Sequence, residues 1–352
     1  MKIKILVLGY FGYITNQLNG QTIKTRHVYK LLKTKSKIFS RIAFYDTQEL
    51  HGNKLSFIKM LSNILKSNVL IYMPAHNNLR YIFPFIYVIC KLKKIKILYF
   101  VIGGWLFEYL QTKPLHKIML SKIHGIFVES NHMRDKLKQV HRYNNVVTLP
   151  NFRLQEFIPP FNNNNEYFKI VFMAQIEMPK GVDVVFKLAE HLSKTPLKGP
   201  HIIIDFYGPI IDNTSKYFYE QLEKYEFVSY KGELQPDKIY EELTSYDLMV
   251  LPTKYYTEGF PGSILDAYIA GVPVVVTQWK YASEFVDNEK TGIIVPFKNG
   301  ENEFIQSVIK LYEDPNLIMI MKYNAYEKSK LYSAASAWEI IKRYIDYDQN
   351  NT

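Results

Sequence analysis

A carboxylate on a glycine-rich loop is the first feature of this sequence that has the chemistry of an active site. Glu258 stands in the segment YTEGFPGS, between the apolar run 247–251 and a helical pattern. Short apolar runs bounded by Pro and Gly are typical of strands buried in a parallel sheet. Because the carboxyl ends of such strands open into the crevice where α/β proteins bind ligands, we expect Glu258 to lie at a ligand site.

The residues after Glu258 are suited to an anion such as a phosphate. A helix is predicted to begin near Pro261 and to stop at Gly271, with a second strand at 273–277. Small residues at a helix N-terminus offer backbone N–H groups to phosphate oxygens. The loop residues predicted to bind a ligand in this way are Gly259, Phe260, Pro261, Gly262 and Ser263. A second carboxylate, Asp266, follows in the first turns of the helix.

Two further segments end predicted strands of the same half of the chain. Lys180 follows the strand 169–174 and precedes a helix, so its ammonium would point into the same crevice and could neutralise a leaving diphosphate. The alternative is one of many solvated lysines. Tyr207 and Gly208 end the strand 201–207, either at a base-binding site or in an ordinary turn.

The first half of the chain holds weaker candidates. Gly20 and Gln21 begin a helix after the first strand, a position that could hold phosphate oxygens or form an ordinary turn. Gly103 and Gly104 end another predicted strand, just before Trp105. Glycines there would allow a ligand to approach the backbone closely, or they would serve only the packing of the chain. The histidines show no HExxH spacing and no GxSxG elbow is present, so we predict neither a metal site nor a serine nucleophile.

Strands and helices alternate along the whole chain, which predicts two doubly wound α/β domains. Strands are expected at 2–8, 41–45, 69–73, 96–102, 125–129 and 145–149 in the first half and at 169–174, 201–207 and 227–230 in the second, where a helix is expected at 236–244. The segment 151–168, with adjacent prolines and four asparagines, breaks the alternation and indicates a linker. We expect an N-terminal domain over 1–160 and a C-terminal domain over 167–334. The last segment, 335–352, carries a helical apolar stripe that includes Trp338 and Ile341, and it is expected to pack back on the first domain. Hydrophobic content of 47% excludes a disordered chain.

Charge is divided unevenly between the two halves. Residues 1–160 carry a net charge of +19, whereas the remainder carries −8. A nucleic acid, an anionic membrane or a phosphorylated lipid would suit the basic half, and no nucleic-acid-binding motif is present. The apolar run of ten within the segment 81–100 is too short to span a bilayer, which needs ~20 apolar residues. Its Tyr, Phe and Lys residues are typical of a lipid interface, and the alternative is a buried helix followed by a strand.

The N-terminus shows no signal-peptide pattern, and the single cysteine, Cys90, has no partner for an internal disulfide and is expected in the core. Both features favour a cytoplasmic protein. With the basic first half, they predict a peripheral protein at the inner face of the cell membrane.

Taken together, the segment EGFPGSILDAYIAGVPVVVT resembles the signature of the retaining glycosyltransferases of the GT-B fold, in particular glycosyltransferase family 4 (glycosyl transferases group 1). The segments MPKGVDVVFKLAEHL, YGP, YDLMVLPT, TLPNF and NGQTIKTRHVYKLL resemble further parts of the family in the same order. The resemblance implies two Rossmann-like domains that face each other across a cleft. It also implies a metal-independent enzyme, without a cofactor, that transfers a hexose from a nucleotide diphosphate sugar, UDP-sugars being favoured.

The resemblance also assigns roles to individual residues. Glu258 would contact the transferred sugar, Lys180 the diphosphate, and Asp266 the ribose, where the family has a glutamate. The usual arginine companion of the lysine falls at Gln175, so phosphate stabilisation would rest more on Lys180, Lys254 and backbone N–H groups. No histidine stands near Gly103 and Gly104, where many relatives carry one, so no N-terminal catalytic base is assigned.

The expected acceptor is a lipid-linked oligosaccharide of bacterial capsule or other surface polysaccharide biosynthesis, bound in part by Gly103, Gly104 and Trp105. Three alternatives remain open at this point. They are a nucleotide-sugar epimerase of the same fold, a catalytically silent nucleotide-sugar-binding subunit of a polysaccharide assembly complex, and a nucleic-acid-binding protein.

Overall fold

The chain divides into two compact units, which are described separately. The first comprises residues 1–155 and 332–352, and the second comprises residues 156–331. The computed structural model describes residues 3–51, 55–74, 76–161, 166–195 and 197–345. The first division lies a few residues before the boundary at 160 expected from the sequence, and the second lies three residues before the expected end at 334. Arg153 pairs with Ser333 in an isolated bridge, so the chain returns to the first unit just before its last helix.

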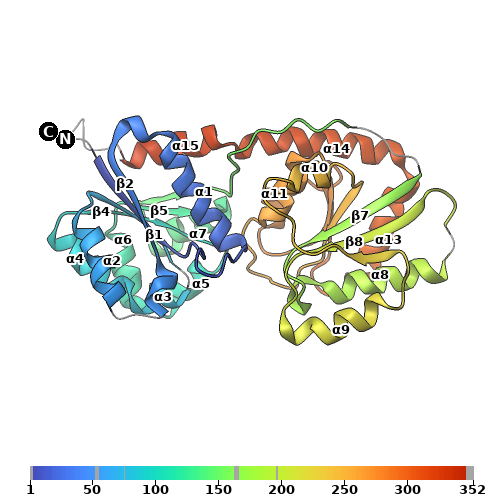
Figure 1. Ribbon diagram of the computed structural model, residues 1–352, viewed down its shortest axis with the longest axis horizontal. Helices are drawn as coiled ribbons and strands as arrows, with labels where there is room; N and C mark the ends of the chain where they lie inside the picture. The colour runs from blue at the N-terminus through green and yellow to red at the C-terminus, as the bar shows by residue number, and fades with distance from the viewer. Residues whose placement is uncertain (1–2, 52–54, 75, 162–165, 196, 346–352) are drawn as a thin grey trace. The chain divides into compact units, whose positions relative to one another are not determined.

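The first unit is a six-stranded parallel sheet with the order β2-β1-β3-β4-β5-β6. Its strands are β1 (Ile3–Gly9), β2 (Phe39–Asp46), β3 (Val69–Met73), β4 (Lys96–Phe100), β5 (Gly125–Val128) and β6 (Val146–Thr148). Its helices are α1 (Gly20–Thr34), α2 (Leu55–Leu65), α3 (His76–Tyr81), α4 (Phe83–Leu92), α5 (Leu106–Gln111), α6 (Pro114–Ser121), α7 (Asn131–His141) and α15 (Ala334–Ile345), with 3-10 turns at η1 (Ser36–Ile38) and η2 (Thr47–His51). Figure 1 shows α1 and α15 on one side of this sheet and α2, α4 and α6 on the other.

The second unit repeats the architecture with the strand order β12-β11-β10-β7-β8-β9, again parallel throughout. Its strands are β7 (Tyr167–Met173), β8 (His201–Tyr207), β9 (Val228–Tyr230), β10 (Leu248–Leu251), β11 (Val274–Thr277) and β12 (Gly292–Val295). Its helices are α8 (Val182–Lys194), α9 (Asp212–Leu222), α10 (Ile239–Leu243), α11 (Gly262–Ile269), α12 (Ala282–Phe285), α13 (Glu301–Glu313) and α14 (Pro315–Ser329), with the turn η3 at Met178–Lys180. The 3-10 turn η4 (Lys330–Tyr332) follows α14.

The last helix is part of the first unit's core. Trp338, Ile341 and Ile345 of α15 lie in the same buried cluster as Ile5 and Val7 of β1. The helix begins at 334 and is described to 345, so residues 346–352 of the predicted segment lie outside the described residues. An apolar stripe at helical spacing predicted this helix, and the residues of the stripe are the ones that lie in the buried cluster.

Element boundaries are where sequence and structure differ most. Strand β4 ends at Phe100 rather than 102, because the chain leaves the sheet toward Gly103, whose φ is +82°. Helix α10 spans 239–243 instead of 236–244, because the residues after Pro236 form a turn.

The segment 81–100 contains α4 followed by β4, and none of the described helices is long and apolar enough to cross a membrane. Cys90 is buried in α4, and burial raises the pKa of its thiol to about 12.

Candidate functional site: the open end of the second sheet

The second sheet has one point where its strand order reverses, between β7 and β10. From β7 the chain proceeds to β8 and β9 on one side, and it then returns to β10 on the other side of β7 before continuing to β11 and β12. The chain therefore leaves β7 and β10 in opposite directions at the carboxyl edge, which is where doubly wound sheets bind ligands. Lys180 lies on the loop after β7 and Glu258 on the loop after β10.

Lys180 and Glu258 are in direct contact. The Lys180 Nζ lies 2.5 Å from Glu258 Oε2, and the two side chains are 17% and 18% exposed. The ammonium also lies 5.0 Å from the ring centroid of Tyr255, over its face. Burial is the main cause that raises the pKa of Tyr255. The Glu177 carboxylate, which accepts a hydrogen bond from the Tyr255 hydroxyl at 3.3 Å, raises this pKa further. The Lys180 ammonium is thus held between a carboxylate and an aromatic ring.

Backbone contacts hold the two loops together. Gly181 has a φ of +85°, and a Cβ at this position would lie 2.0 Å from the carbonyl oxygen of Pro252. The Lys254 N–H donates to the Pro179 carbonyl at 2.8 Å, which connects the same two loops. Lys180 and Glu258 are therefore positioned by a close approach that only glycine allows at 181.

The other cation predicted for this edge has a separate partner. Lys254 Nζ lies 2.5 Å from a carboxylate oxygen of Asp183, which is in the first turn of α8. The Lys254 side chain is 44% exposed. Gln175, where an arginine was expected, is half-buried, and its side chain makes no hydrogen bond with the described residues. Of the two cations, Lys180 is the one paired with a residue predicted to act on the sugar.

Gly208 and Tyr207 lie beside the loop after β7, at the end of β8. Gly208 has a φ of +131°, and a Cβ there would lie 1.9 Å from the carbonyl oxygen of Ala174. The Tyr207 side chain is only 5% exposed, and its hydroxyl donates to Glu242 at 2.7 Å and accepts from Tyr246 at 3.1 Å. We conclude that position 207 contributes to this edge through its backbone, while its phenol belongs to a buried network.

The loop after Glu258 leads directly into α11. Phe260 is buried and stacks on Phe285 of α12, with ring centroids 4.2 Å apart and planes 6° apart. This contact anchors the loop to α12. Pro261 is the N-cap, and no side chain caps the helix that follows with Gly262 and Ser263. Asp266 is 5% exposed, and one of its oxygens accepts the Tyr240 hydroxyl at 3.4 Å. The Asp266 carboxylate is therefore buried within the second unit.

The remaining predicted residues belong to the first unit. Gly20 and Gln21 begin α1 next to the strand reversal between β1 and β3, the equivalent place in that sheet. Asn19 and Thr22 form a capping box around them, which already satisfies one backbone N–H of the helix end. The Nε2 of Gln21 is buried without a hydrogen-bond partner among the described residues.

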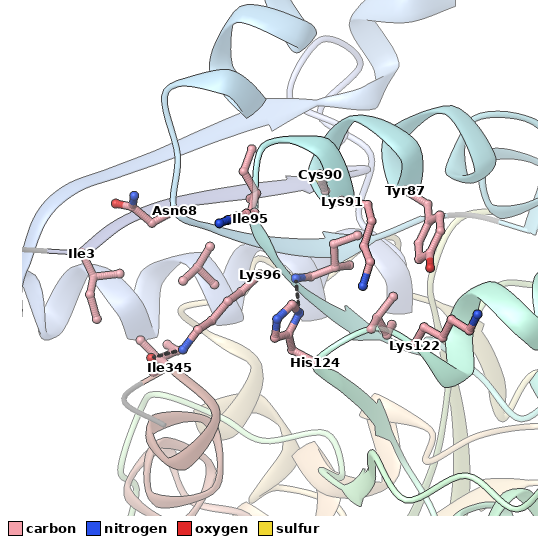
Figure 2. Close-up of a pocket in the computed structure, with 14 residues that line it drawn as sticks. Ile3, Asn68, Tyr87, Cys90, Lys91, Ile95, Lys96, Lys122, His124 and Ile345 are labelled. Atoms are coloured by element: carbon pink, nitrogen blue, oxygen red, sulfur yellow. Dashed lines mark hydrogen bonds between the residues drawn. The ribbon is translucent and has the colours of Figure 1, made fainter. Parts of the chain in front are cut away.

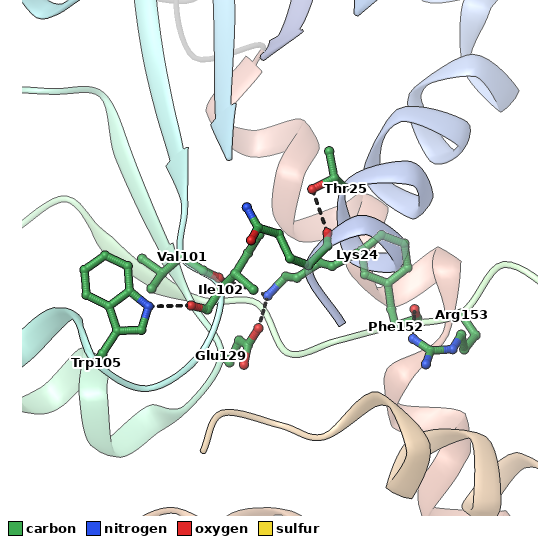
Figure 3. Close-up of polar contacts among 9 residues, drawn as sticks. Lys24, Thr25, Val101, Ile102, Trp105, Glu129, Phe152 and Arg153 are labelled. Atoms are coloured by element: carbon green, nitrogen blue, oxygen red, sulfur yellow. Dashed lines mark hydrogen bonds and ion pairs between the residues drawn. The ribbon is translucent and has the colours of Figure 1, made fainter. Parts of the chain in front are cut away.

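A buried ion pair lies at the carboxyl edge of the first sheet, where sequence reasoning placed no charge. Lys24 Nζ lies 2.6 Å from Glu129, both side chains are 3% exposed, and Lys24 also donates to the Val101 carbonyl at 3.1 Å (Figure 3). Burial lowers the pKa of Lys24, and the Glu129 carboxylate opposes this effect. The signal available in the sequence was Lys24 itself, a cation on the buried face of α1 four residues before Val28.

The ion pair supports the loop predicted to bind the acceptor. That loop leaves β4 at Val101, and the Trp105 Nε1 donates to the Ile102 carbonyl at 2.8 Å (Figure 3). The indole also packs against His76 of α3, with ring centroids 4.8 Å apart. His76 is exposed and follows β3, and it was not among the residues singled out from the sequence. Within the described ranges, no group of three or more His, Cys, Asp or Glu side chains could hold a metal ion.

Solved structures show which class of fold these two units define. HepE of Anabaena, in a structure with UDP and glucose, matches with a TM-score of 0.75 and 13% identity, covering 98% of this chain and 100% of that one. Sucrose-phosphate synthase of Thermosynechococcus elongatus matches with a TM-score of 0.73 and 13% identity over 97% and 98% of the two chains. A glycosyltransferase of Rickettsia africae gives 0.71 and 14% over the full length of both chains. The fold is GT-B, with two Rossmann-like units.

Sequence comparison gives the family. The model for "Glycosyl transferases group 1" matches residues 154–328, which include Lys180, Glu258 and Asp266. The second unit of the chain therefore belongs to this glycosyltransferase family. A Campylobacter jejuni enzyme, N,N'-diacetylbacillosaminyl-diphospho-undecaprenol alpha-1,3-N-acetylgalactosaminyltransferase, is 32% identical over 112 residues. That match covers 32% of this chain and 28% of the enzyme.

Proposed function

We propose that this glycosyltransferase moves a hexose from a UDP-sugar to a hydroxyl of a lipid-linked saccharide, with retention of the anomeric configuration, in bacterial surface polysaccharide biosynthesis. The observation that carries the proposal is the contact of Lys180 with Glu258 at the reversal of the second sheet. This arrangement puts a cation and a carboxylate where a diphosphate and its attached sugar would meet.

The pair suggests how the donor is bound. An incoming diphosphate competes with Glu258 for the Lys180 ammonium, because both offer anionic oxygens to the same donor. Once Lys180 contacts the phosphate, the Glu258 carboxylate is free to accept hydroxyls of the sugar. The N-terminus of α11, which no side chain caps and where Ser263 stands in the first turn, offers further backbone N–H groups to the phosphate.

The same groups act in the transition state. Negative charge develops on the leaving diphosphate as the sugar becomes oxocarbenium-like, and a preorganised donor of this kind typically contributes ~3–4 kcal/mol. In this proposal the Lys180 ammonium and the N–H groups stabilise the leaving group, and no divalent cation or cofactor takes part. Asp266 is proposed to bind the ribose. This requires the Asp266 carboxylate to accept hydrogen bonds from the ribose hydroxyls beside, or in place of, the one from the Tyr240 hydroxyl.

The acceptor and the membrane are proposed on other grounds. The name of the Campylobacter relative states an acceptor joined to undecaprenol through a diphosphate, and we propose an acceptor of that class. The net charge of +19 over residues 1–160 suits both such an acceptor and the anionic inner leaflet. Helices α2, α4 and α6 of the first unit also expose large apolar side chains. The most exposed of these are Leu55, Ile58, Val88, Leu92, Leu115 and Ile118.

The direct test compares two lysine variants of the second unit. Lys180→Ala is expected to lower kcat/KM for donor turnover by about a hundredfold or more, since ~3 kcal/mol of transition-state stabilisation is lost. Lys187→Ala is the matched control, because Lys187 also pairs with a glutamate, Glu301, but on the exposed surface of α8. Its activity should remain close to that of the wild type.

The donor is identified first by a thermal-shift screen of nucleotide sugars, since a ligand at a hundred times its Kd stabilises by ~2.7 kcal/mol. Turnover is then measured with a chelator present. Wild-type turnover by Lys180→Ala would contradict the assignment of Lys180, and a requirement for added Mn²⁺ would contradict the metal-free mechanism. Epimerised donor in the absence of acceptor would indicate the epimerase, and calorimetric binding of UDP without any turnover would indicate a silent binding subunit.

A further inference from the structure

The first unit contains a cavity of about 680 Å³ at the edge of the sheet opposite to the loop of Gly103 and Trp105. It opens at the amino ends of β1, β3 and β4, and it is closed by the last turn of α4, the turn before β5 and the end of α15 (Figure 2). Its position excludes it from the ligand-binding crevice of a doubly wound sheet, which lies at the carboxyl ends of the strands. A ligand in this cavity would therefore bind outside the glycosyl-transfer site.

The rim of the cavity is basic. Lys91, Lys94 and Lys122 are exposed there, and none of the three forms an ion pair with the described residues. Lys96 reaches the backbone carbonyl of Ile345 at 3.5 Å. Among the residues that the structure describes, no aspartate or glutamate lines the cavity. Lysines around one opening without a described carboxylate beside them favour an anion, because their positive potentials add.

The floor of the cavity is apolar, in contrast to the rim. It is formed by aliphatic side chains from the strand ends and from α15: Ile3, Val69, Ile95, Ile97, Ile123 and Ile345. His124 Nδ1 accepts the backbone N–H of Ile97 at 3.2 Å, so in the neutral ring the proton lies on Nε2. A small inorganic anion would contact the lysine rim alone, whereas a ligand with a phosphate and a hydrocarbon part would contact both the rim and the aliphatic floor.

An exposed apolar stripe runs along α4 beside the cavity. Phe85, Val88 and Leu92 are 44%, 53% and 76% exposed, and their spacing places them on one side of the helix. Phe85 also contacts Phe57 of α2, with ring centroids 5.2 Å apart, so the apolar surface continues onto the neighbouring helix. Lys91, on the cavity rim, lies on the flank of this stripe. Lysines beside exposed aliphatic and aromatic residues are typical of helices that lie in a membrane interface.

We propose that this cavity binds the phosphate and glycerol of an anionic phospholipid, with the lysine rim on the phosphate and the isoleucine floor against the first acyl carbons. The stripe of α4 then lies among the acyl chains next to the bound head group. This inference rests on the membrane contact proposed above. It assigns the recognition of anionic lipid to one cavity and not to the general positive charge of the first unit. The bound phospholipid is a membrane anchor, distinct from the saccharide acceptor.

The test measures binding of the full chain to phosphatidylcholine vesicles with and without phosphatidylglycerol, by flotation at physiological ionic strength. The cavity variant is Lys91→Gln/Lys94→Gln/Lys122→Gln. The control variant, Lys30→Gln/Lys37→Gln/Lys138→Gln, removes the same charge from exposed lysines of the same unit that do not line the cavity. We expect the cavity variant to lose about tenfold or more in affinity for phosphatidylglycerol vesicles and the control to lose less than about threefold. Equal thermal unfolding of both variants shows that neither is misfolded.

A competition experiment separates the lipid from soluble phosphates. Short-chain phosphatidylglycerol below its micelle concentration should displace the wild type from vesicles, while glycerol phosphate and inorganic phosphate at the same concentration should not. Equal losses in the two triple variants would overturn the site and leave only general charge attraction. Effective competition by glycerol phosphate would overturn the lipid assignment in favour of a soluble phosphate. Failure of the wild type to bind either kind of vesicle would refute the membrane contact itself, and donor turnover in solution would still report on the glycosyl-transfer site.

Discussion

Replacing Gly181 by alanine tests whether the geometry of the candidate site depends on one close backbone approach. The residue has a φ of +85°, and the added Cβ would lie 2.0 Å from the Pro252 carbonyl oxygen and 2.7 Å from its carbonyl carbon. Ordinary contacts of a Cβ begin near 3.4 Å, so the loops after β7 and β10 must separate by roughly 1 Å or more. Both obstructing atoms are backbone, so no side-chain rotation relieves the overlap.

The energetic cost has two parts, and a second glycine separates them. An alanine in the left-handed region costs ~1–2 kcal/mol, and overpacking adds typically ~1–3 kcal/mol. Gly232, in the same unit, has a φ of +83°, but a Cβ added there would meet no described atom within 4 Å. Gly232→Ala therefore carries the backbone strain alone. Gly181→Ala should be less stable than this control by ~1–3 kcal/mol, or ~3–9 °C in Tm for a unit of this size.

Activity gives the second readout of the same change. Because Lys180 precedes Gly181 and its partner Glu258 follows Pro252 on the other loop, separation of the loops misplaces the pair. A misplacement of about 1 Å commonly costs about a hundredfold in rate, so kcat/KM for donor turnover should fall by that order in Gly181→Ala and stay near wild type in Gly232→Ala. Equal melting temperatures and equal activities of the two variants would refute the steric argument.

Three further outcomes are expected. Gln175→Arg should strengthen UDP binding by about tenfold in calorimetry, since it adds a charge-assisted hydrogen bond at the diphosphate; unchanged affinity would place position 175 away from the phosphates. Lys24→Met should lower the unfolding free energy by ~3–5 kcal/mol by removing the cation that pairs with the buried Glu129 carboxylate, and Lys24→Met/Glu129→Leu should restore most of it; a single variant as stable as wild type would contradict this. Burial and the nearby Arg153 lower the pKa of His27 to about 3, so its neutral form stabilises the fold above the unfolded pKa of 6.5, and this stability is lost as the pH falls toward 3. Between pH 7 and 4.5 the wild type should lose ~2–3 kcal/mol more than His27→Gln in denaturant titrations, and parallel losses would show that His27 does not titrate in this way.

Much of the fold could be predicted because it depends on local pattern. The runs 69–73 and 201–207 coincide with β3 and β8, since buried parallel strands are continuous apolar segments bounded by turn residues. Strand β7 begins at Tyr167, two residues before the predicted start at 169, because pairing with β8 extends to His201. Such end positions depend on a partner strand that the local sequence does not contain.

The partners of the charged side chains could not be predicted for the same reason. Lys24 pairs with Glu129 across 105 residues, and Lys254 pairs with Asp183 across 71. Each pair joins two loops or helix ends that only the strand order brings together. The sequence located Lys180 and Glu258 at strand ends, but their direct contact depends on β7 and β10 being neighbours.

The pairing of the two site lysines bears on how the proposed reaction could proceed without the arginine that the family resemblance implies at position 175. Lys254 is neutralised by Asp183, which has no proposed role in the reaction, so a diphosphate that recruits Lys254 leaves an unpaired carboxylate behind. Lys180 is neutralised by Glu258, which the proposed mechanism requires to be free when the sugar is bound. Exchange of Glu258 for the diphosphate at Lys180 therefore replaces one ion pair by another and releases the carboxylate at the place where the sugar arrives. A single lysine can serve in this scheme because its resting partner is itself a substrate-binding group.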